Sequence, residues 1–136
     1  MRVREIMTDS VDFVTNENTL QEAAEKMKEL DVGELPIIVG KEAVGVITDR
    51  DIAIRGVALG LDPTSAKVVD AMSEGIVSCR QDDEAEMAAR LMGEHKIRRL
   101  PVTDADGNMT GMLSLGDLAA KLDKSLIGDV LMQISR

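Results

Sequence analysis

The strongest constraint on what this chain can fold into is an internal repeat that runs through nearly all of its 136 residues. Residues 3–8 (VREIMT) align with residues 68–73 (VVDAMS), and the register continues without a gap through the next strand and helix. The second copy then gains one residue in a glycine-containing turn, after which residues 45–51 (GVITDRD) align with residues 111–117 (GMLSLGD). Because turns tolerate insertions, the chain is predicted to contain two copies of one structural unit.

Each copy begins with a short strand and an amphipathic helix. Residues 11–14 and 76–79 are predicted as strands because short apolar runs follow turn-forming residues. Asn18 with Gln21 is predicted to cap the first helix. Apolar residues of both copies then recur at helical spacing: Leu20, Ala23, Ala24, Met27 and Leu30, and Ala85, Ala88, Ala89 and Met92.

A hairpin and a second helix complete each copy. Residues 35–39 and 43–47 flank a short turn that contains Gly40, and the second copy turns through residues 104–108. Further helices are expected from about Asp49 and Leu115 in the two copies. Each copy therefore has the order β-α-β-β-α, with too few strands to bury a core alone.

These elements predict a mixed α/β (α+β) fold, in which two pseudo-symmetric units pack through their sheets. A terminal amphipathic helix is expected because Leu126, Ile127, Val130, Leu131 and Ile134 share one helical face. The predicted domain organisation follows the repeat: residues 1–61 as the first unit with its N-terminal lead-in, 62–68 as a linker, 69–122 as the second unit and 123–136 as the terminal helix.

Charge and composition exclude several classes of function. With 25 acidic and 16 basic residues, the net charge of −9 opposes binding to nucleic acid or to anionic membranes. No apolar run approaches the roughly twenty residues that span a bilayer, and no signal peptide is evident, so a cytoplasmic location is expected. A single cysteine, Cys79, and a single histidine, His95, leave little material for a metal site or a catalytic triad.

Aromatic residues are almost absent, since the chain has no Trp, no Tyr and only Phe13. Aromatic side chains are the usual stacking platforms for single-stranded nucleic acid, so the composition argues against that function. Any planar ligand would have to rest between aliphatic side chains.

The repeated motifs resemble a tandem of CBS domains, also called a Bateman module. Both copies carry a Met-Thr or Met-Ser opening, a Leu-Pro strand (residues 35–36 and 100–101) and a Gly-φ-φ-[Thr/Ser]-x-x-Asp segment, where φ is apolar. The resemblance covers residues 2–122, and residues 48–63 are similar to the corresponding run of small stand-alone bacterial CBS-pair proteins. It implies disc-like homodimers and clefts between the units that bind adenosine compounds such as AMP, ADP, ATP or S-adenosylmethionine.

The resemblance assigns roles to the two Thr/Ser-x-x-Asp motifs. Asp51 and Asp117 would accept hydrogen bonds from the ribose hydroxyls, while Thr48 and Ser114 would contact ribose or phosphate. The same pattern is also a helix capping box, which needs no ligand. The two interpretations are compatible, because a ligand can recruit a capping residue.

Basic residues differ between the copies. Arg50 lies inside the first motif and is a candidate phosphate partner, but Gly33-Glu34 precedes the first Leu-Pro strand. Arg98 and Arg99 stand before the second Leu-Pro strand, where the family often has phosphate-binding residues, and a solvated loop is the alternative. Apolar walls for adenine are implied for Val11, Phe13, Pro36, Ile76, Val77, Pro101 and Val102, all of which also suit a buried core.

The leading hypothesis is a non-catalytic regulatory module that senses adenosine nucleotides and signals through a change in conformation or dimer geometry. It requires no cofactor and predicts a homodimer with an unidentified protein partner. The alternative is a constitutive homo-oligomeric interaction module with vestigial pockets. Acid–base catalysis by Asp51 or Asp117 is the weakest hypothesis, because no nucleophile–base pair accompanies them.

Overall fold

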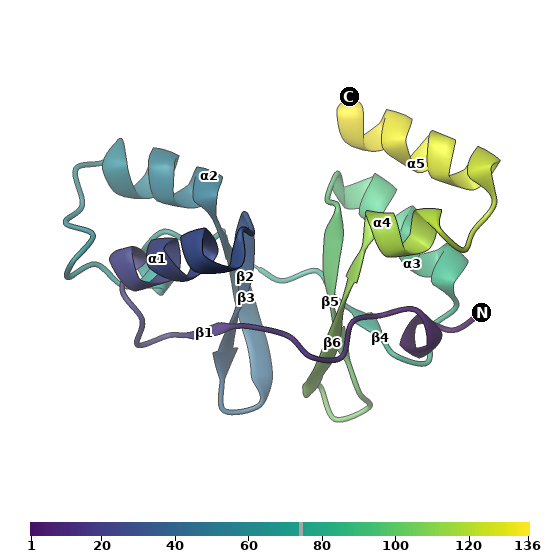
Figure 1. The fold of residues 1–136 in the computed structure, drawn as a ribbon, viewed down its shortest axis with the longest axis horizontal. Coiled ribbons are helices and arrows are strands. Elements are labelled where there is room, and N and C mark those ends of the chain that lie inside the picture. Colours follow the sequence, from purple (N-terminus) through teal and green to yellow (C-terminus); the bar gives the residue numbers. More distant parts are fainter. Residues whose placement is uncertain (74) are drawn as a thin grey trace. The chain divides into compact units, whose positions relative to one another are not determined.

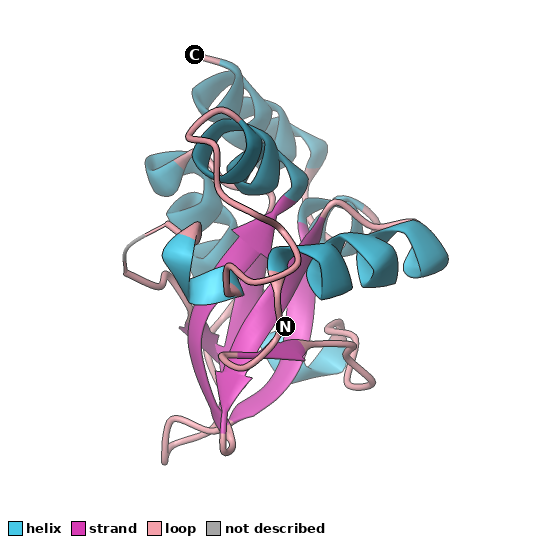
Figure 2. Cartoon of the chain, turned by 90° about the vertical axis from the view of Figure 1, so that its left-hand side faces the viewer, coloured by secondary structure: helices cyan, strands magenta, loops and turns pink. Residues whose placement is uncertain are grey.

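The computed structural model describes residues 1–73 and 75–136, which form two compact units. The first unit comprises residues 12–76, and the second unit comprises residues 1–11 together with residues 77–136. Both units combine a three-stranded sheet with helices, which confirms the predicted mixed fold (Figure 2).

The first unit contains a sheet of order β1-β2-β3, in which β1 is parallel to β2 and β3 is antiparallel to it (Figure 1). Its elements are β1 (Val14–Thr15), α1 (Leu20–Leu30), β2 (Glu34–Val39), β3 (Glu42–Thr48), α2 (Asp49–Asp51), the π-helix η2 (Ile52–Val57) and the 3-10 helix η3 (Val68–Asp70). Thus β3 runs directly into the helix that carries Asp51.

The second unit repeats this topology in a sheet of order β4-β5-β6. Its elements are the 3-10 helix η1 (Val3–Glu5), β4 (Cys79–Arg80), α3 (Ala85–His95), β5 (Arg99–Thr103), β6 (Met109–Ser114), α4 (Leu115–Ala119) and α5 (Lys124–Ser135). Both sheets have a register shift at equivalent places, between Ile37 and Ile38 and between Val102 and Thr103. The sequence repeat is therefore also a structural repeat.

Two local predictions from the sequence were wrong in position. The predicted strands 11–14 and 76–79 pair with their sheets only at Val14–Thr15 and Cys79–Arg80, each through two residues. The cap of α1 is Thr19, whose hydroxyl accepts the Glu22 N–H at 3.1 Å, rather than Asn18 with Gln21. Asn18 instead accepts the Thr15 N–H at 2.8 Å, so it closes the preceding turn.

Each unit has its own apolar core. The α1 stripe contributes Leu20, Ala23 and Met27 to the first core, and Ala85, Ala88, Ala89 and Met92 of α3 occupy the second. The predicted terminal helix is confirmed as α5, which packs on α3 and buries Ile127 and Val130 (Figure 1). That burial explains why its sequence is amphipathic.

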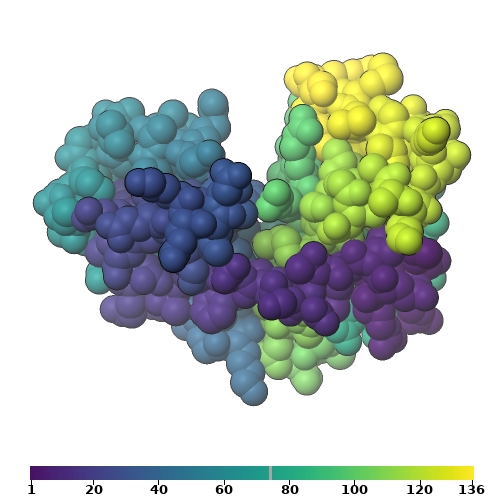
Figure 3. Space-filling view, in the orientation of Figure 1, coloured from purple at the N-terminus to yellow at the C-terminus, as the bar shows by residue number. Residues whose placement is uncertain are grey.

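The two lead-in segments, residues 3–8 and 68–73, each pack with the unit formed by the other copy. Val3 is fully buried in the second core, and Thr8 forms an antiparallel bridge with Met112. Figure 3 shows the N-terminal segment, in purple, against the green residues of the second unit. Val68 is fully buried in the first core, and its N–H donates to Asn18 O at 2.9 Å. The two copies have thus exchanged their lead-in segments.

Two glycines make this exchange sterically feasible. A Cβ on Gly45 would lie 2.8 Å from Sδ of Met72, and a Cβ on Gly111 would lie 2.7 Å from both Sδ of Met7 and the backbone oxygen of Thr8. Real Cβ atoms do not approach other atoms so closely, so something must shift if either glycine gains a side chain. On β6 the obstacle includes the Thr8 backbone, whereas on β3 it is the flexible Met72 side chain.

The two compact units have other boundaries than the division that follows from the sequence repeat. Residues 62–68, predicted as the linker, belong to the first unit, where the Leu20 N–H donates to Ala66 O at 2.9 Å and the Gln21 N–H donates to Pro63 O at 3.0 Å. The first unit ends at Ile76. The division at 1–61 and 69–122 follows the sequence repeat and remains a prediction.

Candidate functional site

Both Thr/Ser-x-x-Asp motifs form complete capping boxes. The Asp117 N–H donates to Ser114 Oγ at 3.0 Å, and the Ser114 N–H donates to Asp117 Oδ2 at 2.9 Å. In the first unit the Asp51 N–H donates to Thr48 Oγ1 at 3.0 Å, and the Thr48 N–H donates to Asp51 Oδ2 at 3.1 Å. Capping therefore uses one carboxylate oxygen of each aspartate and leaves Oδ1 for another donor.

A cavity of about 430 Å³ adjoins the second motif. Its polar side is formed by Arg98, Arg99 and Ser114, beside the bare backbone of Gly116. Its apolar side consists of residues from α4 and α5: Leu115, Ala119, Ile127 and Leu131. This volume lies within the range of about 300–1,000 Å³ that is typical of small-molecule sites.

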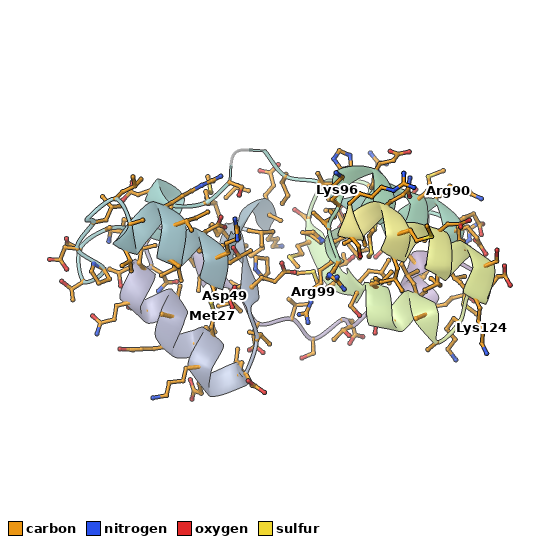
Figure 4. All side chains as sticks on the ribbon, turned by 90° about the horizontal axis from the view of Figure 1, so that it is seen from above. Met27, Asp49, Arg90, Lys96, Arg99 and Lys124 are labelled. Carbon is orange, nitrogen blue, oxygen red and sulfur yellow. The ribbon has the colours of Figure 1, made fainter. Side chains whose placement is uncertain are left out.

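A backbone hydrogen bond positions the arginine pair beside α4. The Leu115 N–H donates to Arg98 O at 2.8 Å, which ties the start of β5 to the first turn of the helix. Figure 4 shows Arg99 beside α4, and both arginine side chains are exposed. Since guanidinium groups bind phosphate and carboxylate through paired N–H donors, this arrangement suits an anionic group.

The equivalent place in the first unit is acidic. The Asp49 N–H donates to Gly33 O at 2.9 Å, so Gly33 and Glu34 occupy the positions that Arg98 and Arg99 hold in the second unit. Asp49 replaces Leu115 at the first helical position. Arg50 is exposed, but it follows this acidic group directly. An anion would therefore meet acidic side chains beside the first motif and basic side chains beside the second.

The predicted apolar walls lie in different environments. Pro36 and Pro101 are buried in β2 and β5, and Val102 is fully buried in the second core. Phe13 is 44% exposed and its ring lies 5.7 Å from Nζ of Lys26.

The remaining wall residues are half-buried and fall on both sides of the unit boundaries: Val11 and Val77 belong to the second unit, Ile76 to the first. Their contact with adenine stays a prediction.

Asp51 is the buried charged residue of the described chain, with 6% of its surface exposed. The Ser73 hydroxyl donates to its Oδ1 at 3.4 Å, and Arg55 Nη1 donates to Ser73 Oγ at 3.3 Å. Asp117 is only half-buried. Sequence reasoning missed Ser73, although its alignment with Thr8 placed both residues in corresponding lead-in segments.

Redox or metal chemistry finds little support in the described residues. Burial raises the pKa of the Cys79 thiol to about 12, with the Asp83 carboxylate as a second cause, so the reactive thiolate is suppressed. Within residues 1–73 and 75–136, no group of three or more His, Cys, Asp or Glu side chains is placed to hold a metal ion. The same residues include no helix long and apolar enough to cross a bilayer.

The duplicated topology and the paired capping motifs define a CBS-domain pair. The CBS domain family matches residues 3–56 and 68–124, and the chain belongs to this family. The family match ends as α5 begins, so the apolar wall formed by Ile127 and Leu131 lies outside it.

Similar proteins include small stand-alone CBS-domain proteins. The CBS domain-containing protein YhcV of Bacillus subtilis is 40% identical over 134 residues, which are 98% of this chain and 94% of that protein. Hypoxic response protein 1 of Mycobacterium tuberculosis is 34% identical over 125 residues, or 91% of this chain and 87% of that protein. A crystal structure of Hypoxic Response Protein I with two coordinated zinc ions has a TM-score of 0.83 at 34% identity, covering 90% of this chain and 99% of that one.

A further solved relative is CBSX2 of Arabidopsis thaliana. Its structure in complex with AMP has a TM-score of 0.71 at 30% identity and covers 99% of this chain and 98% of that chain. CBS-pair folds close to this one therefore include an AMP complex.

Proposed function

We propose that the chain is a non-catalytic regulatory module that binds an adenosine nucleotide, with the second copy as the principal site. The phosphate would lie on Arg98 and Arg99, the Ser114 hydroxyl would contact ribose or phosphate, and Asp117 Oδ1 would accept a ribose hydroxyl. The observation that carries this proposal is the 430 Å³ cavity, which groups two arginines and the motif serine around one space. The AMP complex of CBSX2 supports the choice of ligand class.

The charge contrast between the copies supports the choice of site. A nucleotide phosphate meets Arg98 and Arg99 in the second copy, whereas Glu34 and Asp49 hold the matching positions in the first. Like-charge contacts disfavour an anion, and Arg50 is the basic residue inside the first motif that would have to offset them. A signal by change in conformation or dimer geometry, a homodimer, a protein partner and a cytoplasmic location are parts of this proposal.

Calorimetry and thermal unfolding with AMP, ADP, ATP and S-adenosylmethionine test the proposal. A ligand at a hundred times its dissociation constant is expected to stabilise the protein by about 2.7 kcal/mol. Replacing Arg98 with Ala is expected to weaken nucleotide binding by about ten-fold or more, because a charge-assisted hydrogen bond is lost.

Arg50→Ala is the matched control, since it removes an exposed arginine from the first motif. This variant is expected to leave the nucleotide affinity of the second copy unchanged. If none of the four compounds changes the unfolding temperature, the proposal is wrong.

The alternative function is a constitutive oligomeric interaction module. It is favoured by exposed apolar side chains at and just after the end of η2 and on α5, where Val57 and Leu59 are each 70% exposed and Met132 is 60% exposed. Leu59→Glu and Met132→Glu are expected to lower the oligomer mass in native mass spectrometry if this alternative holds. An unchanged mass with intact nucleotide binding would favour the sensor instead.

A further inference from the structure

The last helix, α5, forms part of the wall of the 430 Å³ cavity. Its residues Ile127 and Leu131 line that space together with Leu115 and Ala119 of α4. Leu131 is the more accessible of the two, since it keeps 39% of its surface exposed and Ile127 keeps 7%. A ligand that fills the cavity therefore covers apolar surface that belongs to α5.

Packing alone attaches α5 to the rest of the second unit. Ile127 and Val130 are buried in its core, and Leu126 and Ile134 pack against that core. Figure 1 shows α5 beside α3 and α4. Among residues 1–73 and 75–136, no hydrogen bond or ion pair joins α5 to another helix or strand. The docking of α5 therefore depends on a small set of apolar side chains.

The helix is weak when it is not docked. It has 12 residues, and isolated helices of about this length are marginal in water. Gly128 lies within the helix, where glycine lowers helix stability, and Asp123 at the N-cap forms no side-chain hydrogen bond with the first turn. We therefore expect α5 to open locally, before the rest of the second unit unfolds.

Three consecutive residues of α5 have three different surroundings. Val130 is 1% exposed and lies in the second core. Leu131 lines the cavity, whereas Val130 and Met132 do not. Met132 is 60% exposed. The docking of the helix, its contact with a ligand and its exposed surface can therefore be changed one at a time.

We propose that a nucleotide bound in the second copy holds α5 on α3 and α4, with Leu131 and Ile127 as ligand contacts. The ligand joins α5 to Arg98 and Ser114, which line the same cavity. This inference rests on the proposed function and adds its regulation, because it names the element whose docking changes with occupancy. The family match ends at residue 124, so this element lies beyond the matched CBS segment.

Thermodynamic linkage gives the proposal a measurable form. The factor by which AMP favours the docked helix equals the factor by which the docked helix favours AMP. Local opening lets the α5 amides exchange with solvent, so saturating AMP is expected to slow their hydrogen exchange on the order of ten-fold. Hydrogen exchange of the full chain with and without AMP measures this effect, and calorimetry measures binding separately.

The three neighbouring residues supply the variants. Val130→Ala removes a buried side chain, so it is expected to speed α5 exchange without AMP about ten-fold or more, while AMP slows that exchange by the same factor as in the wild type. Leu131→Ala removes a ligand contact, so it is expected to weaken AMP binding about three-fold and to reduce the slowing of α5 by the same factor. Met132→Ala is the matched control and is expected to change neither quantity. Alanine is the best helix former, so none of these changes weakens the helix itself.

AMP binding without slower exchange of α5 would overturn the inference and leave the proposed function standing. Equal slowing in L131A and the wild type would also overturn it, because Leu131 would then make no contact with the ligand. If calorimetry detects no binding of AMP, ADP, ATP or S-adenosylmethionine, the proposed function is wrong and the inference falls with it. Circular dichroism establishes the fold of each variant, and the comparison of L131A with M132A decides the inference if V130A does not fold.

Discussion

The two copies place the same four-residue motif in different surroundings. Asp51 is buried, accepts the Ser73 hydroxyl and lies close in sequence to the acidic Asp49. Asp117 is half-buried, and Ser114 at the start of its motif lines a cavity with two arginines. The motif itself forms the same capping box in both units. The difference therefore arises from residues outside the motif.

Two short segments account for the contrast. One is the pair before each Leu-Pro strand, Gly33-Glu34 or Arg98-Arg99, and the other is the lead-in residue, Ser73 or Thr8. The shared capping box preserves the helix start in both units, so it cannot report which site binds. In this CBS pair both copies keep the same capping box, while the residues that flank it differ between the copies.

The largest expected effect concerns the exchanged lead-in segments. Val3→Ala and Val68→Ala each remove two methyl groups from a fully buried side chain and are expected to lower the free energy of unfolding by about 2–3 kcal/mol. Hydrogen exchange measured for each unit is the readout. V3A is expected to speed exchange in β4–β6 and V68A in β1–β3, which places each effect in the other copy.

The two variants are controls for each other, because the substitutions are chemically identical. Faster exchange of V3A confined to β1–β3 would contradict the exchange of lead-in segments. If each variant speeds hydrogen exchange equally in both sheets, the two units unfold together. The two lead-in segments would then be compared through the loss of unfolding free energy in each variant.

Effects of similar or smaller size are expected at the glycines beneath the lead-in methionines. Gly111→Ala is expected to destabilise the protein by about 2–3 kcal/mol, because its Cβ would meet the Thr8 backbone as well as Met7. Gly45→Ala is expected to cost about 1 kcal/mol, since Met72 and the Ile37 side chain can move. Urea denaturation measures both, and an equal cost would mean that the Thr8 backbone shifts freely.

The smallest effect is expected from the caps. Thr48→Ala and Ser114→Ala each remove a hydroxyl that accepts a backbone N–H at 3.0 Å, which costs about 1 kcal/mol in thermal unfolding. Their effects on AMP affinity are expected to differ, because only Ser114 lines the cavity with Arg98 and Arg99. Equal losses of AMP affinity would show that Ser114 acts through capping alone.

Much of the fold could be predicted because its determinants are local or repeated. The hairpin turns, the α1 and α3 stripes and the helix starts at Asp49 and Leu115 follow from short-range patterns that appear twice. The cap of α1 was misplaced by one residue because Asn18 and Thr19 are both good acceptors, and the tertiary turn at Thr15 decides between them. The motif residues were predicted from the repeat as well.

The rest of the candidate site depends on contacts that no local pattern encodes. Ser73 meets Asp51 across 22 residues of sequence, and Ile127 and Leu131 reach the Arg98 cavity only because α5 folds back on α3. Helical periodicity predicted that α5 has an apolar face, but not which surface that face would cover. The sequence therefore singled out the polar residues that line the cavity, Arg98, Arg99 and Ser114, but not the apolar residues of α5 that line it with them.

The exchange of lead-in segments has a consequence for the order in which the chain folds during synthesis. The first unit, residues 12–76, is a continuous stretch, so all its contacts are available before the second unit has been made. Met1 lies beside Glu84, and its backbone oxygen accepts the Ala85 N–H at 2.9 Å, so residues 1–11 find their partners more than half a chain away. Such distant closure is slow, and we expect residues 1–11 to be the last part of the second unit to become protected.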